Sequence, residues 1–197
     1  FDALNSPLLK LLSSRSKWLR FAVTQAVMRS PWNLRPFLGV KKSVNPKGVA
    51  LFASAYLNEL RRTGSDTSLE RARWCLERLE QTGVPTRHGL GWGYSFDWQS
   101  TLFFAPKYTP NAIVTVFCAE AFLKGFELVG DENYLHLARL AALFLRHDLP
   151  VLHESADELC IGYVPLPTSS IVLNINASAG GLLAKVAHHL SNDELMR

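Results

Sequence analysis

Leu69-Glu70-Arg71-Ala72-Arg73 returns further along the chain as Leu135-His136-Leu137-Ala138-Arg139. A turn that combines glycine with an acidic residue precedes each copy: Thr63-Gly64-Ser65-Asp66 in the first and Val129-Gly130-Asp131-Glu132 in the second. Glycine readily adopts the left-handed conformation that ends a helix, and an acidic residue can cap the helix that follows. Each unit therefore predicts a long apolar helix, a short turn and a second, amphipathic helix.

Proline marks the expected start of each unit. Asn45-Pro46 opens the first apolar helix and Thr109-Pro110 the second. Proline favours the first helical position, because the N–H group that it lacks would have no partner there. A third copy starts at about Ser170, where Ala177–Leu190 has a helical pattern and Asn192–Leu195 matches the start of the earlier amphipathic helix. The predicted hairpins cover about 45–83, 109–148 and 170–197. The third is incomplete, so we expect a longer protein with further C-terminal hairpins, or self-association.

The repeat predicts an all-α fold of tandem α-hairpins that form part of an (α/α) toroid, with a helical solenoid as the related architecture. TPR, HEAT and ankyrin repeats are shorter, at roughly 33 to 47 residues. The extra length here lies in 84–108 and 149–169, which are rich in Gly, Pro and aromatic residues, as loops at the mouth of a toroid would be. Residues 1–44 predict a less regular region with two short helices (Pro7–Leu12 and Ser16–Met28) and a linker, followed by the partial toroid over 45–197.

Composition argues against several classes of function. Hydrophobic residues make up 48% and charged residues 19% of the chain, which is not the composition of a disordered protein. The net charge of +4 comes from scattered basic residues, so no nucleic-acid partner is expected. No apolar run approaches the roughly 20 residues that cross a bilayer, so no membrane span is expected. Three separated cysteines and no signal peptide predict a reducing, cytoplasmic location.

Chemistry-bearing motifs are few. The sequence has no HExxH-type spacing, no GxGxxG, no P-loop lysine motif and no GxSxG elbow, so neither a metal nor a cofactor is expected. The sharpest feature is the segment 91–100, in which Trp92, Tyr94 and Trp98 surround Asp97 and Gln99. Sugars bind to such mixtures, because a pyranose face stacks on an aromatic ring while carboxylate and amide groups bind the hydroxyls. Asp97 is the candidate general acid or base; the alternative is that the rings fill the barrel end and Asp97 caps a turn.

A glycosidase needs a second carboxylate, about 5 to 9.5 Å from the first. Glu120 is the candidate, because it interrupts an apolar helix; the alternative is that Glu120 bonds a neighbouring helix. Tyr163 is expected to face the same mouth as Tyr94. Asn174 and Asn176 offer two amides at the start of the third hairpin, where they bind a ligand or cap the helix. Other carboxylates that could complete a pair are Glu154, Asp157 and Glu158.

Five short stretches carry a resemblance to a known group. They are Ser30–Pro36, Asn45–Gly48, Gly91–Gln99, Thr109–Asn111 and Gly162–Pro165. With these the chain resembles bacterial proteins from polysaccharide gene clusters, which are similar to six-hairpin (α/α) toroid carbohydrate enzymes. The resemblance implies a substrate in the funnel at one barrel end, and an activity of the glycoside hydrolase, polysaccharide lyase or sugar epimerase type. Only two and a half of the six hairpins are recognised here, and (α/α) toroids also host unrelated functions.

Two functions therefore remain to be distinguished. The chain acts on or binds a bacterial polysaccharide or oligosaccharide, with Asp97 as acid or base and the aromatic rings against the sugar. Alternatively it is a non-catalytic binding or assembly module built from helical repeats. A cleft shared by Asp97, a second carboxylate and the rings of Trp92 and Trp98 favours the first. A dry, packed Trp92 with Asp97 capping a backbone amide favours the second. A terpenoid-cyclase function is disfavoured, because the sequence has no DDxxD or DxDD cluster.

Overall fold

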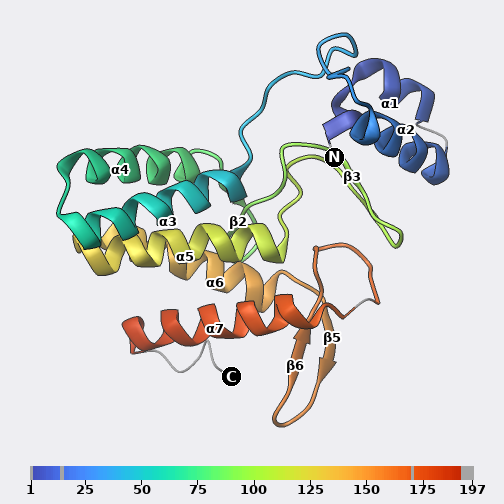
Figure 1. The fold of residues 1–197 in the computed structure, drawn as a ribbon. Coiled ribbons are helices and arrows are strands. Elements are labelled where there is room, and N and C mark those ends of the chain that lie inside the picture. Colours follow the sequence, from blue (N-terminus) through green and yellow to red (C-terminus); the bar gives the residue numbers. More distant parts are fainter. Residues whose placement is uncertain (1, 14–15, 170, 192–197) are drawn as a thin grey trace.

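The computed structural model describes residues 2–13, 16–169 and 171–191. Within them, five long helices carry the hairpin array (Figure 1): α3 (Pro46–Thr63), α4 (Asp66–Glu80), α5 (Ala112–Val129), α6 (Glu132–His147) and α7 (Leu173–Leu190). Helices α3 and α4 form the first hairpin, and α5 and α6 form the second. The predicted tandem α-hairpins are confirmed.

Both hairpin turns end the first helix at a glycine in the left-handed region. Gly64 has φ 68° and Gly130 has φ 76°, and their N–H groups donate to Leu60 and Phe126 carbonyl oxygens, both at 2.8 Å. The acidic cap is confirmed only in the second turn, where Asp131 accepts from the N–H of Asn133. In the first turn it is wrong, because Ser65 caps α4 and Asp66 is the first helical residue.

The helix starts also correct two expectations. Pro46 does occupy the first position of α3, after the cap Asn45. Pro110, however, pairs with Gly93 in an isolated bridge, and α5 begins at Ala112 because Asn111 accepts from the Val114 N–H and so supplies the cap. Helix α7 begins at Leu173, earlier than the predicted 177–190. Ser170 and the match at 192–195 lie outside the described residues.

Helix α5 is the centre of the array. It contacts α3 and α7 on its two sides and packs against α4 and α6 as well. Ten of its residues are buried, among them Cys118 and Phe122. Burial raises the pKa of the Cys118 thiol well above its ordinary value, so this cysteine is a core hydrophobe, as such thiols usually are. Other large core side chains are Trp92 and Phe144.

The segments between the hairpins carry short antiparallel strand pairs at one end of the array (Figure 1). Strand β1 (Val84–Pro85) pairs with β2 (Leu90–Gly91), β3 (Trp98–Gln99) with β4 (Phe104–Ala105), and β5 (Val151–Glu154) with β6 (Leu159–Ile161).

The N-terminal region forms a 3₁₀ turn, η1 (Asp2–Asn5), and two helices, α1 (Pro7–Ser13) and α2 (Lys17–Arg29). Both helices match the predicted ones within a residue or two, and η1 was not predicted. A stretch over 30–45 leads from α2 to α3, and the helices themselves lie beside β3 at the loop end of the array (Figure 1). Among the described residues, none of the helices is long and apolar enough to cross a membrane.

Candidate functional site

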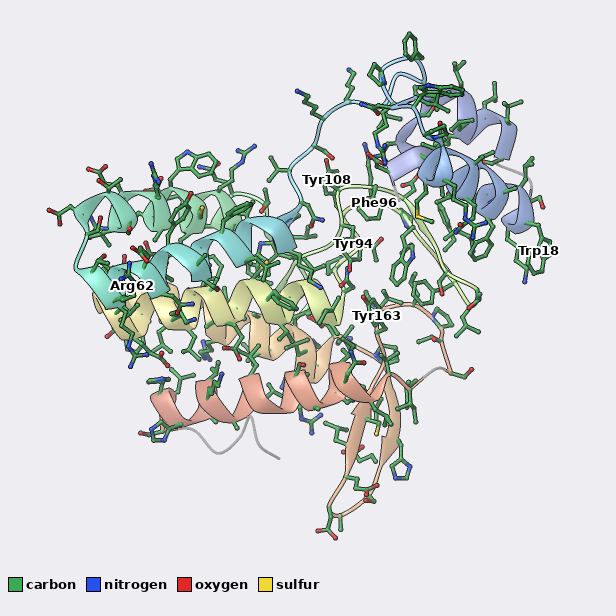
Figure 2. All side chains as sticks on the ribbon, in the orientation of Figure 1. Trp18, Arg62, Tyr94, Phe96, Tyr108 and Tyr163 are labelled. Atoms are coloured by element: carbon green, nitrogen blue, oxygen red, sulfur yellow. The ribbon has the colours of Figure 1, made fainter. Side chains whose placement is uncertain are left out.

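The segment Tyr94–Trp98 presents different side chains to its two sides. Tyr94, Phe96 and Trp98 line one cavity of about 270 Å³ together with Asn45. Ser95 and Asp97 line another cavity, of about 490 Å³, to which the N-terminal region contributes residues such as Asn5 and Lys10. This alternation is the one expected of extended backbone, where successive side chains point to opposite faces. Figure 2 shows Tyr94 and Phe96 on this segment, between the helical array and the N-terminal helices.

The aromatic side chains form one contiguous group, here called the aromatic cluster: Tyr94, Phe96, Trp98, Phe103 and Tyr163. Tyr94 stacks on Phe96 with ring centroids 5.0 Å apart, and its edge meets Trp98 at 5.8 Å. Trp98 in turn meets Phe103 at 5.1 Å and Tyr163 at 5.3 Å, both edge to face. Such arrangements stabilise aromatic pairs beyond the area they bury.

Tyr163 joins the cluster from the segment that precedes α7. Its backbone oxygen accepts from the Ala112 N–H at 2.9 Å, which ties this segment to the start of α5. Burial raises the pKa of the Tyr163 hydroxyl far above its ordinary value, and the hydrogen bond with Tyr94 raises it further. Tyr163 is therefore a neutral phenol at physiological pH, hydrogen-bonded to Tyr94.

Asp97 lies on the other side of the segment, 3% exposed. Its Oδ2 accepts from Lys10 Nζ at 2.7 Å and its Oδ1 from the Lys107 N–H at 2.8 Å. The N–H of Asp97 donates to Asn5 Oδ1 at 3.4 Å. The carboxylate is thus an ion-paired group that caps a backbone amide, and it lines a different cavity from Tyr94, Phe96 and Trp98.

Trp92 differs from the expectation that it contacts a ligand. Its side chain is fully buried (0% exposed), its Nε1 donates to the Leu79 carbonyl oxygen at 2.8 Å, and its ring meets Phe122 at 5.7 Å. The expected cleft around Trp92, Asp97 and Trp98 is not formed. Alternation places Asp97 on the opposite side of the segment from Trp98. The hydrogen bond from the indole N–H of Trp92 to Leu79 holds Trp92 in the core.

Gln99 and Glu120 both have protein partners. Gln99 Oε1 accepts from Arg20 Nε at 2.6 Å, and Gln99 Nε2 donates to the carbonyl oxygens of Ser100 and Phe103. Glu120 is partly exposed and accepts from Lys185 Nζ at 2.9 and 3.0 Å. The alternative raised for Glu120, a bond to a neighbouring helix, is therefore confirmed, since Lys185 belongs to α7.

The two asparagines at the start of α7 have different surroundings. Asn176 Oδ1 accepts from the Ile161 N–H at 2.7 Å, and its Nδ2 donates to the oxygens of Ile161 and Val172. It therefore joins β6 to the first turn of α7, inside the helix rather than at its cap. Asn174 is exposed in the same turn. In the described residues no group of three or more His, Cys, Asp and Glu side chains could hold a metal ion.

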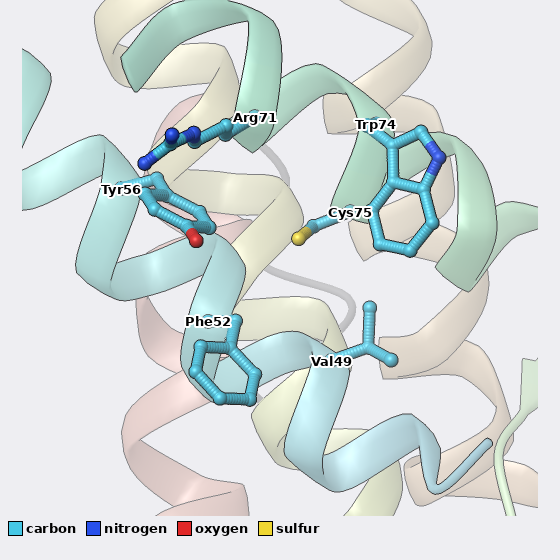
Figure 3. Close-up of a pocket in the computed structure, with 6 residues that line it drawn as sticks. All are labelled: Val49, Phe52, Tyr56, Arg71, Trp74 and Cys75. Carbon is cyan, nitrogen blue, oxygen red and sulfur yellow. The ribbon is translucent and has the colours of Figure 1, made fainter. Parts of the chain in front are cut away.

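Another cavity, of about 290 Å³, lies on the α3–α4 hairpin (Figure 3). Val49, Phe52 and Tyr56 contribute from α3, and Arg71, Trp74 and Cys75 from α4. The Arg71 guanidinium lies 5.7 Å from the Tyr56 ring centre, and Phe52 and Trp74 are 61% and 64% exposed. This face belongs to the outer side of the first hairpin.

Several residues around the candidate site were not singled out from the sequence. Phe96 and Phe103 belong to the aromatic cluster, Asn45 lines its cavity and Lys10 pairs with Asp97. The spacing of Phe96, two residues from both Tyr94 and Trp98, was the available signal for its position. Lys10 and Asn45 could not be found in this way, because only the folded chain brings them to the segment.

No protein-family model matches the sequence, and a search of curated proteins gives no match. Solved structures do match. The GH76 α-mannanase of Bacteroides thetaiotaomicron has a TM-score of 0.58 at 16% identity, over 79% of this chain and 42% of the mannanase. The cellobiose 2-epimerase of Spirochaeta thermophila has a TM-score of 0.58 at 19% identity, over 76% of this chain and 39% of the epimerase.

A third similar structure is an inactive variant of the GH76A α-1,6-mannanase of Salegentibacter sp. HEL1_6, with two adjacent aspartates replaced by asparagine and α-1,6-mannotriose bound. Its TM-score is 0.54 at 16% identity, over 98% of this chain and 56% of the mannanase. The chain thus spans between 39% and 56% of the length of these three structures. At these identities the likeness shows the fold, and the predicted similarity to (α/α) toroid proteins of the glycosidase and epimerase type is confirmed at that level.

Proposed function

We propose that the chain is the carbohydrate-binding part of an (α/α) toroid protein that acts on or binds a bacterial polysaccharide or oligosaccharide. The observation that carries the proposal is the cavity lined by Tyr94, Phe96, Trp98 and Asn45. It combines ring surfaces, which stack on the C–H face of a sugar, with an amide that donates to and accepts from hydroxyls. The similar mannanase binds α-1,6-mannotriose, which adds to the case for a saccharide ligand.

Acid–base catalysis by Asp97 or Glu120 has less in its favour. Each carboxylate is ion-paired with a lysine, and Asp97 lies on the opposite side of its segment from the rings. The mannanase variant is inactive after loss of two adjacent aspartates, and the present sequence contains no Asp-Asp pair. We therefore propose that Asp97 holds the segment in place and that the rings bind the ligand. The glycoside hydrolase alternative in particular remains tied to carboxylates that reach the sugar.

The test is a glycan-binding screen that includes α-1,6-mannotriose, with the wild type, Trp98→Ala and Trp74→Ala. Trp74 is the matched control, because it is an exposed tryptophan on the α3–α4 face. We expect Trp98→Ala to weaken glycan binding about tenfold or more, which corresponds to about 1.4 kcal/mol, and Trp74→Ala to leave it unchanged. Circular dichroism of each variant shows whether the helical array is retained.

The screen is also run on Asp97→Asn, with release or rearrangement of each bound glycan followed over time. If the wild type turns a glycan over, and Asp97→Asn abolishes turnover but still binds the glycan, Asp97 is catalytic after all. A well-folded wild type that binds no glycan, or equal losses in Trp98→Ala and Trp74→Ala, would sink the proposed sugar site and leave the assembly-module alternative.

A further inference from the structure

Lysines gather around the cavity on the polar side of the segment Tyr94–Trp98. Lys10 comes from α1, Lys41 and Lys42 from the stretch that leads to α3, and Lys107 from the loop before α5. We call this cavity, of about 490 Å³, the lysine pocket. The side chains that determine its charge thus come from three separate parts of the sequence.

The charges in the lysine pocket do not balance. Asp97 is the acidic residue that lines it, and its carboxylate already binds Lys10 Nζ at 2.7 Å. Across the part of the chain that the structure describes, Lys41, Lys42 and Lys107 have no carboxylate within ion-pair distance. Three uncompensated positive charges around a concavity produce a positive potential, which a bound anion lowers.

The wall of the lysine pocket also offers hydroxyl groups and a constrained backbone. Ser43 Oγ and Ser95 Oγ lie 3.0 Å apart in a hydrogen bond. Tyr108, also in the wall, has φ 66°, a left-handed conformation that is uncommon for residues other than glycine. Its N–H donates to the Tyr94 oxygen at 2.7 Å, while the adjacent Lys107 N–H binds Asp97. These bonds fix the backbone that carries Lys107 beside the pocket, and backbone strain of this kind often accompanies a binding site.

We infer that the lysine pocket binds the carboxylate or phosphate group of a small, hydroxyl-bearing anion. Lysine ammonium groups bind such oxygens as point charges, and the serine and tyrosine hydroxyls bind the neutral part of the ligand. The inference goes beyond the proposed function, because this pocket lies on the opposite side of the segment from the aromatic cluster and attracts its ligand by charge. Either site can exist without the other.

The experiment is isothermal titration of the full chain at 50 and 300 mM NaCl with four probes. Trigalacturonate carries carboxylates, glucose 6-phosphate carries an organic phosphate, inorganic phosphate carries no sugar, and maltotriose is neutral. The test variant is Lys41→Gln/Lys42→Gln, with Lys107→Gln as a second. The control is Lys17→Gln/Lys124→Gln, which removes the same charge from two lysines outside the pocket, the first exposed and the second half-buried.

We expect trigalacturonate or glucose 6-phosphate to bind the wild type at 50 mM NaCl. The affinity should be about tenfold lower in the double test variant and unchanged in the control. Which of the two binds more tightly identifies the anionic group. Binding should weaken at 300 mM NaCl, since salt screens exposed charges, and it should survive Trp98→Ala, which separates this site from the proposed sugar site. Three results would overturn the inference. They are no binding of either sugar anion, binding of inorganic phosphate alone, and an equal loss of affinity in the test and control variants.

Discussion

Lys10 Nζ donates to the carboxylate of Asp97 at 2.7 Å, across 87 positions of sequence. The carboxylate is 4% exposed and the lysine side chain 62%, so the buried partner depends on the exposed one for its counter-charge. Asn5 Nδ2 adds a bond to the Ser95 oxygen at 3.0 Å, and Arg20 Nε adds its bond to Gln99. The N-terminal helices are therefore held to the segment Tyr94–Trp98 and its continuation into β3 by polar contacts.

Replacing Asp97 by asparagine is expected to destabilise the protein. Asparagine keeps the shape and can still accept from the Lys107 N–H, but the charge-assisted bond to Lys10 is lost, and such bonds contribute about 1.5–3 kcal/mol. Lys10→Gln should cost at least as much, because it leaves the buried Asp97 carboxylate without its counter-charge. Urea denaturation of both variants followed by circular dichroism gives the free energies of unfolding.

Glu59→Gln is the matched control for that pair. Glu59 forms an exposed ion pair with Arg62 at 2.7 Å within α3, and its loss should change the free energy of unfolding by less than about 0.5 kcal/mol. If Asp97→Asn behaves like Glu59→Gln, the polar contacts to the N-terminal helices contribute little to stability.

Local signals accounted for much of the helical array. Glycine after an apolar run located the ends of α3 and α5 at Gly64 and Gly130, because few other residues adopt the left-handed region. The pair Thr109-Pro110 predicts too early a start for α5, because Asn111, one residue further, is the better cap. Element types therefore followed from periodicity, while one boundary depended on a competition between neighbouring cap residues.

The candidate site was less predictable, because it depends on contacts between distant segments. The aromatic character of 91–100 is visible in the sequence. Because side chains alternate along an extended chain, the sequence also predicts that Tyr94 and Trp98 lie on the same face of the segment. The burial of Trp92 was not, since it depends on Leu79 and Phe122 in two helices. The partner of Asp97 was not predictable either, because nothing local connects Lys10 to position 97.

Gly93→Ala is expected to be among the most damaging single substitutions. An added Cβ would lie 2.1 Å from the Thr109 carbonyl oxygen, and backbone cannot move aside as a flexible side chain can. The bridge between Gly93 and Pro110 would have to open, which also displaces the start of α5. We expect a loss of about 3 kcal/mol or failure to fold, as for other overpacked positions.

Gly180→Ala is the opposite case and serves as its control. Gly180 lies within α7, and an added Cβ would meet nothing within 4 Å. Alanine in a helix interior should stabilise the protein by roughly 0.5–1 kcal/mol relative to glycine. A thermal melt of the two variants should therefore shift in opposite directions, and a shared downward shift would contradict the described position of α7.

Asn111→Ala tests the cap of the central helix. Asn111 is 2% exposed and its Oδ1 accepts from the Val114 N–H at 3.1 Å, so alanine leaves a buried donor without a partner. The expected loss lies at the upper end of the range for cap residues, about 2 kcal/mol, and Asn111→Ser should recover most of it. Asn45→Ala, at the exposed cap of α3, should cost about 1 kcal/mol or less. Equal losses at both caps in urea denaturation would contradict the argument from burial.

Asp148 predicts a pH dependence of stability. Burial by itself raises the pKa of its carboxyl, but hydrogen bonds from Thr86 Oγ1 and from the His88 ring and N–H outweigh burial, so the pKa lies below its ordinary value of 3.8. The carboxyl therefore stays ionised in the folded protein at pH values where it is already protonated in the unfolded chain. The unfolded chain binds more protons in that window, and stability falls as the pH falls through it.

The contribution of Asp148 is complete above about pH 5, where the carboxyl is ionised in both states, and it is lost below its folded pKa. Asp148→Asn removes this dependence while keeping the side-chain shape. The difference in free energy of unfolding between wild type and variant should therefore be largest near pH 6 and shrink steadily below about pH 4, with every other carboxyl cancelling in the subtraction. Urea denaturation at pH 6, 5, 4 and 3 gives that difference. A difference that is constant over this range would show that the bonds from Thr86 and His88 do not hold the carboxylate in its ionised form.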